Sequence, residues 1–226
     1  KGAYRWISLG AFKIQPSEFA KIAIVLFLAD YFHRNNRFSG EAWKGFVKPC
    51  LSVGALVALI LAGKSLSVTM IAGAIVFCLL FVCGVRMRYL AIIVVAGLAL
   101  VFAVNKFDPV RAKRIASFQN PEIVSQDEGY QLWNSLLALG SGGATGQGFT
   151  KSRMKLEYLP EAHNDFILAI VGEELGFAGL LVVILLYMAF LYASLRIAAA
   201  ATDYRGMILA SGLGLGIALH AAVNIG

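Results

Sequence analysis

The chain has 226 residues and a net charge of +7; 59% of its residues are hydrophobic and only 15% are charged. A soluble domain carries about 25% charged and about 45–50% apolar residues, and the apolar surplus here is gathered in long runs. The composition therefore excludes an ordinary soluble domain and indicates a membrane protein. The basic residues lie mostly between the apolar runs, without the interleaved aromatic residues that stack bases. We expect contact with membrane lipids and no binding of nucleic acid.

Apolar runs of about 20 residues can cross the hydrocarbon of a membrane, and they predict an all-α, polytopic fold. The fifth run is long enough to tilt or project. Both ends of the chain look cut, because it begins without a methionine or a signal-peptide pattern and stops within an apolar run. We expect a single membrane domain, a fragment spanning 1–226, with helices at about 18–32, 46–63, 66–84, 89–105, 166–195 and 207–226.

A long polar region at about 106–165 separates the fourth and fifth helices. Within it, 130–139 is amphipathic and predicts a short helix that lies on the membrane or re-enters it. A loop of this length is more often functional than idle. Basic residues at 33–48, 85–89 and 196–206 fall on one side if all five complete helices span, and that side would be cytoplasmic. The long polar region is then expected to face outward.

The first helix opens with a polar motif, Gln15-Pro16-Ser17-Glu18-Phe19-Ala20-Lys21. Ser17 is a candidate N-cap, which would put Glu18 in the first turn. Glu18 and Lys21 are three residues apart, so they share a helix face and can pair. Two interpretations stay open: a structural ion pair, or a pair that lines a polar cavity where a charged substrate binds.

A glycine-rich stretch at 140–148 is followed by three cations, Lys151, Arg153 and Lys155. It is not a P-loop, because it lacks the Gly-Lys-Ser/Thr ending. Glycine backbones can approach a phosphate, and the cations would attract one. The alternative is a loop with solvated cations.

The acidic segment from Pro160 to Asp165 comes directly before the fifth helix. Asp165 is a plausible helix cap, since the helix dipole stabilises a carboxylate at an N-terminus. The alternative is a general base or a metal ligand at the boundary between water and lipid. His163, two residues earlier, is by itself most simply a polar loop residue.

Two adjacent carboxylates, Glu173 and Glu174, stand in the middle of the fifth apolar run. At that depth they need partners or protonation. Gly172 and Gly176 flank them and would let another helix approach closely. The carboxylates could line the same cavity as Asp165 or pair with a lysine of another helix, and the spacing does not separate these readings.

Four motifs in order resemble the SEDS family, whose members are FtsW, RodA and SpoVE. They are Arg5-Trp6-Ile7, the 15–21 motif, Lys-Leu-Glu-Tyr-Leu-Pro-Glu-Ala-His-Asn-Asp-Phe-Ile at 155–167, and Gly-Glu-Glu-Leu-Gly at 172–176. The last two are closer to FtsW or SpoVE than to RodA. One departure is Gly-Lys-Ser-Leu-Ser at 63–67, where many members carry Gln-Pro-Asp-Leu-Gly-Thr.

The resemblance implies a peptidoglycan glycosyltransferase that polymerises lipid II beside a class B penicillin-binding protein, with other division proteins. It implies a bacterial cell membrane location with the catalytic face outward. The family's essential aspartate falls on Asp165. The expected substrate-binding residues are Arg5, Glu18, Lys21, Lys151, Arg153, Lys155, Glu161 and His163, and the expected structural or cavity residues are Gln15, Pro16, Ser17, Glu173 and Glu174.

Polymerisation of this kind needs a group that takes the proton of the attacking sugar hydroxyl and cations that balance the departing pyrophosphate. Asp165 is the candidate base, or it helps to hold a divalent ion such as magnesium or manganese. Two rival functions remain at this point: a flippase for the lipid-linked precursor, and a non-catalytic scaffold of the division machinery.

Overall fold

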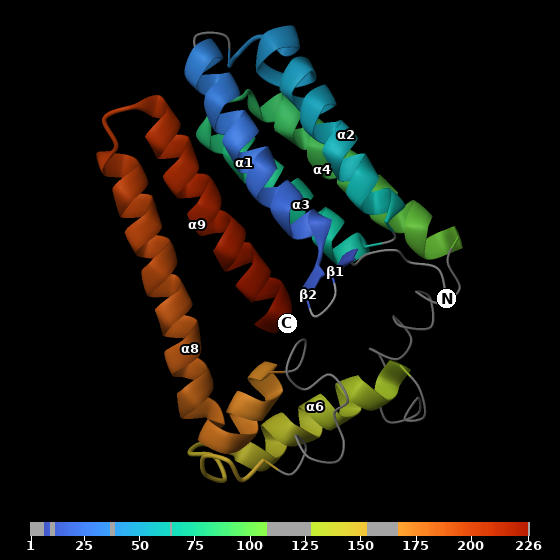
Figure 1. Cartoon of the computed structure of the whole chain (residues 1–226), viewed down its shortest axis with the longest axis vertical. Helices are drawn as coiled ribbons and strands as arrows, with labels where there is room; N and C mark the ends of the chain where they lie inside the picture. Colours follow the sequence, from blue (N-terminus) through green and yellow to red (C-terminus); the bar gives the residue numbers. More distant parts are fainter. Residues whose placement is uncertain are drawn as a thin grey trace. The chain divides into compact units, whose positions relative to one another are not determined.

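The computed structural model describes residues 7–9, 12–36, 39–63, 65–107, 128–152 and 167–225. Within these ranges nearly every element is a helix, as the composition predicts (Figure 1). The elements are β1 (Ile7–Leu9), β2 (Phe12–Ile14), α1 (Pro16–Asn35), η2 (Ala42–Val47), α2 (Lys48–Ala62), α3 (Leu66–Val82), α4 (Met87–Phe107), α6 (Glu128–Gly142), α8 (Ile167–Ala200) and α9 (Tyr204–Ile225).

The chain divides into two compact units, and each is described by itself. The first unit comprises Lys1–Ala99 and Phe190–Ala221, and the second comprises Leu100–Ala189 and Ala222–Gly226. Among the described residues, three helices are long and apolar enough to cross a membrane: Ala42–Ala62, Ile167–Ala200 and Tyr204–Asn224. Because several helices of one chain have this property, the protein is a multi-pass membrane protein.

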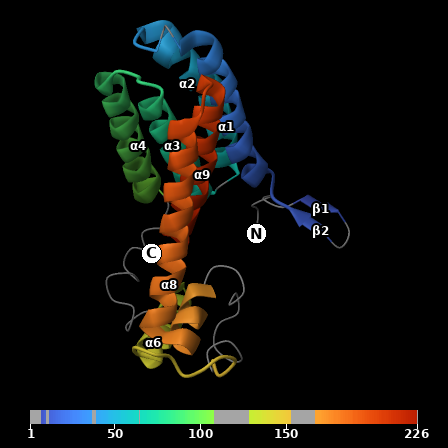
Figure 2. The ribbon, with the colours of Figure 1, turned by 90° about the vertical axis from the view of Figure 1, so that its left-hand side faces the viewer.

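A short antiparallel hairpin precedes α1, and the sequence reading did not anticipate it. Strand β1 pairs with β2, with Ile7 opposite Ile14 and Leu9 opposite Phe12. Figure 2 shows the hairpin leading directly into the first helix. At this junction Gln15 is extended, and Pro16 occupies the first helical turn, where its missing N–H and fixed φ are favourable.

The prediction that Ser17 caps α1 is wrong, because the helix begins one residue before it. Gln15 is the N-cap residue, and its side chain makes no capping hydrogen bond. The backbone N–H of Glu18 donates to the Gln15 carbonyl oxygen at 3.1 Å. Pro16 explains the earlier start, since proline is pre-organised for the first helical position. Glu18 still lies in the first turn, as expected.

The core of the first unit is built from one face of each helix. On α1 the buried residues recur with helical spacing, at Ile24, Leu28 and Phe32. They belong to one apolar cluster with Leu79 of α3 and, from α9, Ile208. This cluster fixes how α1, α3 and α9 pack against one another.

A glycine lets α9 approach its neighbours closely. A Cβ atom added to Gly212 would lie 2.7 Å from Val25 Cγ1 and 3.0 Å from Leu79 Cδ2. No side chain fits in that space without displacing α1 or α3. The register of α9 along α1 is therefore set by close packing at this point.

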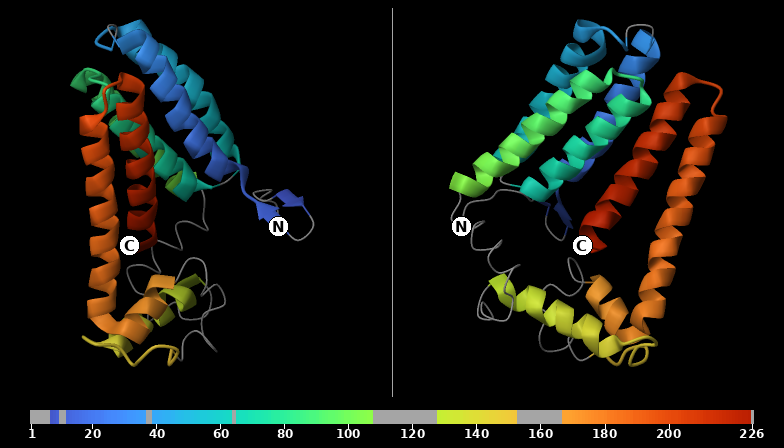
Figure 3. Two further views of the ribbon diagram at one scale, coloured as in Figure 1. Left: turned by 60° about the vertical axis from the view of Figure 1, so that its left-hand side comes forward. Right: turned by 180° about the vertical axis from the view of Figure 1, so that it is seen from behind.

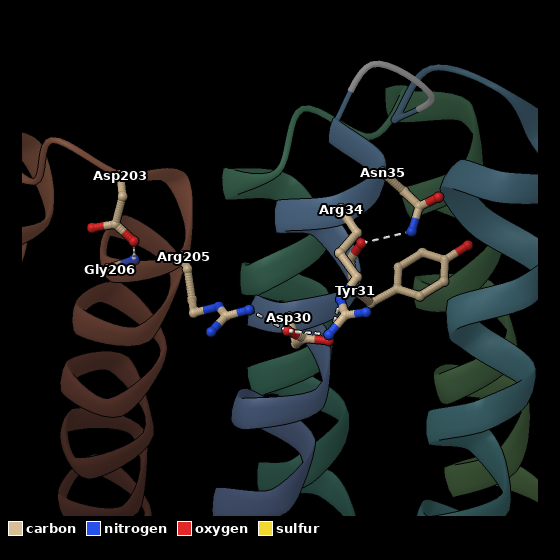
Figure 4. A network of polar contacts seen from close by, with 7 residues as sticks. All are labelled: Asp30, Tyr31, Arg34, Asn35, Asp203, Arg205 and Gly206. Atoms are coloured by element: carbon tan, nitrogen blue, oxygen red, sulfur yellow. Dashed lines mark hydrogen bonds and ion pairs between the residues drawn. The ribbon is translucent and has the colours of Figure 1, made fainter.

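Ion pairs join α1 and α9 near the beginning of α9 (Figure 4). The Asp30 carboxylate accepts hydrogen bonds from Arg205 of α9 and from Arg34, whose Nε lies 2.9 Å from Asp30 Oδ2. Asp203 caps α9, because its Oδ2 accepts the backbone N–H of Gly206 at 2.8 Å. The start of α9 is thus held to α1 by a charged contact.

Candidate functional site

The charged pair predicted at the beginning of α1 is present. Lys21 Nζ lies 2.9 Å from Glu18 Oε2, and the two residues are three positions apart on the helix. Lys21 is only 8% exposed, whereas 44% of the Glu18 side chain is exposed. The ammonium therefore sits among apolar helices, and its carboxylate partner lies at the edge of the bundle. Burying an ammonium group without such a partner costs free energy.

A second partner reaches Lys21 from a distant part of the chain. Lys21 Nζ lies 3.1 Å from Nδ1 of His220 on α9, 199 positions away in the sequence. An ammonium group only donates, so Nδ1 must be the acceptor and the imidazole carries its proton on Nε2. Glu18, Lys21 and His220 thus form a connected polar group within the first unit.

Sequence reasoning missed His220, although a signal for it exists. A polar, titratable side chain inside an apolar span is expensive and marks function by default. His220 lies in α9, which is long and apolar enough to span a membrane. The cost of a polar side chain in an apolar span therefore marks His220 as a candidate functional residue, just as it marks Lys21.

Beside this group, a groove opens between the beginning of α1 and the end of α2. Its volume is about 260 Å³, and it is lined by Pro16, Ser17, Ala20, Leu56, Leu59, Ile60, Gly63 and Ser65. The lining is mainly apolar, with two serines among its residues. Pro16 and Ser17 line this hollow of the first unit, and its identity with the expected substrate cavity stays a prediction.

In the second unit, α8 is broken at Gly176. This glycine has φ 68° and ψ −166°, a conformation outside the helix, and Figure 3 shows α8 changing direction at the break. The part from 177 to 200 is about 36 Å long at 1.5 Å per residue, enough by itself to cross a membrane. Glu173 and Glu174 thus lie within the apolar run but in the short part before the break.

The glycine-rich turn after α6 is hydrogen-bonded to this break. The backbone N–H of Gln147 donates to the Glu173 carbonyl at 2.9 Å, and that of Gly148 donates to the Glu174 carbonyl at 3.0 Å. In the other direction, the Phe177 N–H donates to the Gly143 carbonyl at 2.9 Å. The sequence left open that backbone N–H groups of the 140–148 stretch bind a phosphate. The N–H groups of Gln147 and Gly148 already donate to carbonyls of α8, so these two are not available to bind one.

The glycines make this junction possible. A Cβ atom on Gly142 would overlap the carbonyl oxygen of Gly172, and one on Gly176 would overlap the backbone nitrogen of Gly146. Gly146 and Gly176 also have positive φ, of 79° and 68°, which glycine adopts without steric strain. The glycines that flank Glu173 and Glu174 therefore leave room for other segments: Gly172 lies against the end of α6, and Gly176 lies against the glycine-rich turn.

The two carboxylates at the junction are buried and differ in their contacts. Glu173 is 1% exposed, and its Oε2 accepts a hydrogen bond from Ser152 Oγ at 2.6 Å. Glu174 is 7% exposed, and its Oε1 has no hydrogen-bond partner among the described residues. The pairing of either carboxylate with a lysine of another helix stays a prediction.

Most residues of the predicted polar loop fall outside the described ranges. They include Asp165, Arg153, Lys155, Glu161 and His163, and Arg5, near the beginning of the chain, also lies outside these ranges. Lys151 is described: it is exposed and follows the glycine-rich turn, where its N–H donates to the Gly148 carbonyl at 3.1 Å. The described residues contain no group of three or more metal-ligating side chains. The expectation of magnesium or manganese at Asp165 stays a prediction.

Comparisons with known proteins agree along the whole chain. The family model FTSW_RODA_SPOVE, described as cell cycle protein, matches residues 1–226. Among curated relatives named probable peptidoglycan glycosyltransferase FtsW, that of Tolumonas auensis is 39% identical over 228 residues and that of Aliivibrio salmonicida is 38% identical over 228 residues. These matches cover 100% of this chain but 59% and 57% of the two relatives, so the chain spans less than two thirds of their length.

A solved structure is similar as well. It is described as "Structural coordination of polymerization and crosslinking by a peptidoglycan synthase complex", and the TM-score is 0.75 at 24% identity. The similarity covers 100% of this chain and 62% of that one. At this identity the match shows that the two chains share a fold.

Proposed function

The chain belongs to the FtsW/RodA/SpoVE family of cell-cycle proteins, and from this membership we propose that it is part of a peptidoglycan glycosyltransferase. The enzyme polymerises lipid II into glycan strands during cell division or sporulation. The names of the relatives support this activity. The protein lies in the bacterial cell membrane with its catalytic face outward.

The observation that carries the proposal is the buried ammonium of Lys21. A cation inside a bundle of membrane helices is expensive and marks a path for substrate or ions. Lys21 is 8% exposed and is paired with a carboxylate that is itself 44% exposed. The pair therefore connects an apolar interior with a polar edge, which suits a substrate that has a prenyl chain and a charged head group.

In the proposed reaction, a sugar hydroxyl oxygen forms a bond to the anomeric carbon of a lipid-linked donor. The bond from that carbon to the pyrophosphate oxygen breaks, and the lipid pyrophosphate leaves with the electron pair. Asp165 takes the proton of the attacking hydroxyl as general base. Lys21 donates a hydrogen bond to the pyrophosphate, and Arg5, Lys151, Arg153 and Lys155 are further partners for its charge. Glu161 and His163 contact the sugar head group.

A divalent cation held at Asp165 would supply further charge neutralisation for the leaving pyrophosphate. A separate experiment tests whether the reaction requires this metal. Polymerisation by the purified protein after treatment with EDTA, and again after magnesium or manganese is restored, tests it. A rate that neither treatment changes contradicts a metal requirement.

The proposed protein partner is a class B penicillin-binding protein, a transpeptidase that crosslinks the new strands. Other division proteins and the surrounding lipids complete the assembly. Support comes from the shared fold with a chain of a peptidoglycan synthase complex. Copurification of the full-length protein with a tagged transpeptidase from bacterial membranes tests this part.

The test of the activity compares the full-length protein with its Asp165→Asn variant, using labelled lipid II with and without the transpeptidase. We expect polymer from the wild type and a loss of at least about 100-fold in the variant, the range of general-base catalysis. Asp203→Asn is the matched control, because Asp203 caps α9 and asparagine caps equally well.

Each alternative has its own outcome in this experiment. Normal polymerisation by Asp165→Asn contradicts the assignment of the base. If neither protein makes polymer but both move lipid across vesicle membranes, the protein is a flippase. If neither makes polymer or moves lipid, but both bind the transpeptidase, it is a scaffold.

A further inference from the structure

The imidazole of His220 holds the ammonium that the proposed reaction uses. Lys21 Nζ lies between two acceptors, Glu18 Oε2 at 2.9 Å and His220 Nδ1 at 3.1 Å. An ammonium group has three N–H donors. Among the described residues these two contacts use two of them, and one donor is left for an oxygen of a bound anion.

We propose that His220 is a positioning residue for glycosyl transfer, which holds Lys21 so that its remaining N–H meets an oxygen of the lipid-linked pyrophosphate. This inference rests on the proposed function and goes beyond it. It adds a residue of α9 to the proposed substrate-binding residues of the first helix.

A lysine needs such support because of its length. Its charge sits on a flexible stem of four carbons with three rotatable donors. Glu18 alone would draw the ammonium toward the edge of the bundle, since 44% of the Glu18 side chain is exposed. An acceptor on a second helix opposes that pull and keeps Lys21 at 8% exposure. The ammonium is then pre-organised for an anion, which is how fixed donors contribute most to catalysis.

The position of His220 is itself well defined, because α9 is fixed along α1. The start of α9 is joined to α1 by the ion pair between Asp30 and Arg205. Further along, Gly212 permits direct contact with Val25 and Leu79. His220 lies two helical turns beyond Gly212, about 12 Å along the axis. A rigid helix thus carries the imidazole to Lys21.

A purely structural role for His220, as a polar link between two membrane helices, makes different predictions. Such a link stabilises the protein and has no special relation to the substrate. In contrast, a positioning residue changes the affinity for the charged donor, and its effect depends on Lys21. The pyrophosphate already carries most of its negative charge before the bond breaks and gains more as it leaves, so the loss should appear mainly in KM and to a smaller extent in kcat.

The test uses the full-length protein and labelled lipid II. His220→Leu keeps an apolar side chain but has no acceptor, whereas the side-chain carbonyl of His220→Gln retains one. We expect His220→Leu to raise KM about tenfold, the loss of one charge-assisted hydrogen bond, with kcat changed less than about twofold. His220→Gln should stay within about twofold of the wild type. His33→Leu, a change of the exposed histidine on α1, is the control.

A double-mutant cycle completes the test. If His220 acts through Lys21, then His220→Leu has no further effect in a Lys21→Met background. The inference is overturned if the two losses multiply, if the KM of His220→Leu is unchanged, or if His220→Gln behaves like His220→Leu. A wild type that binds lipid II without polymerising it overturns the proposed function instead. The dependence of lipid II binding on Lys21 and His220 can still be measured in that case.

Discussion

The contact between α1 and α9 and the junction between the α6 turn and α8 both hold charged residues, but by different means. In the first, side chains from two helices meet: Lys21 with His220, and Asp30 with Arg205. In the second, the backbone makes the contact: N–H groups of the turn donate to the Glu173 and Glu174 carbonyls before Gly176, and N–H groups of α8 after Gly176 donate to carbonyls of the turn. Side-chain contacts leave room for a conservative replacement. Backbone contacts between glycines leave almost none, since any Cβ atom fills the space that the other segment occupies.

The largest effect is expected where a Cβ atom enters the glycine junction. In Gly142→Ala the new methyl group overlaps the Gly172 carbonyl, so α6 and α8 must separate. We expect the free energy of unfolding to fall by about 3 kcal/mol or more, as for severe overpacking. Denaturation in mixed micelles, followed by tryptophan fluorescence, measures it.

Gly140→Ala is the matched control for this change. Gly140 lies two residues earlier in α6, and a Cβ atom there meets nothing within 4 Å. Alanine also favours the helix by roughly 1 kcal/mol relative to glycine. Equal stabilities of the two variants would contradict the close approach of α6 to α8.

A smaller effect is expected from the buried hydrogen bond between Ser152 and Glu173. Ser152→Ala removes the hydroxyl that donates to Glu173, and both residues are buried. Removing one partner of a buried hydrogen bond costs about 1–3 kcal/mol. The same denaturation experiment should therefore show a clear loss, while the backbone contacts keep the fold.

Ser141→Ala controls for the loss of a serine hydroxyl. Ser141 is exposed, and its hydroxyl donates to the carbonyl of Ala138 in its own helix. We expect a change within about 0.5 kcal/mol, as for most surface substitutions. If Ser152→Ala is as mild as this control, the buried contact with Glu173 contributes little.

The two regions also differ in what the sequence could predict about them. The pair of Glu18 and Lys21 follows from a spacing of three residues on a helix, and the structure contains it. His220 lies 199 positions from Lys21, so no local pattern joins them. Such a contact depends on which helices pack together, and periodicity within one helix does not contain that information.

The glycine junction shows a second limit of sequence reasoning. Apolar residues continue on both sides of Gly176, so a reading based on apolar runs joins two helices into one. The break is stabilised by the turn at 143–148, which supplies partners for the backbone groups that leave the helix. Flanking glycines did predict a close approach, but the approaching segment is this turn and the end of α6. Ser17 failed as a cap for a local reason, since Pro16 starts the helix earlier.

The smallest effect is expected at the ion pair between α1 and α9. Arg205→Gln removes the charged contact with Asp30, but both side chains are more than 40% exposed, and Asp30 keeps Arg34 as a partner. Exposed ion pairs contribute about 0–1 kcal/mol, so we expect a loss of about 0.5 kcal/mol that shrinks at high salt. Arg196→Gln is the control, since the Arg196 guanidinium contacts Tyr192 within its own helix. A loss several times larger at Arg205 would mean that this pair and not the apolar packing at Gly212 fixes α9. The position of His220 would then depend on a contact that ionic strength can weaken, and the KM for lipid II should rise with salt in step with it.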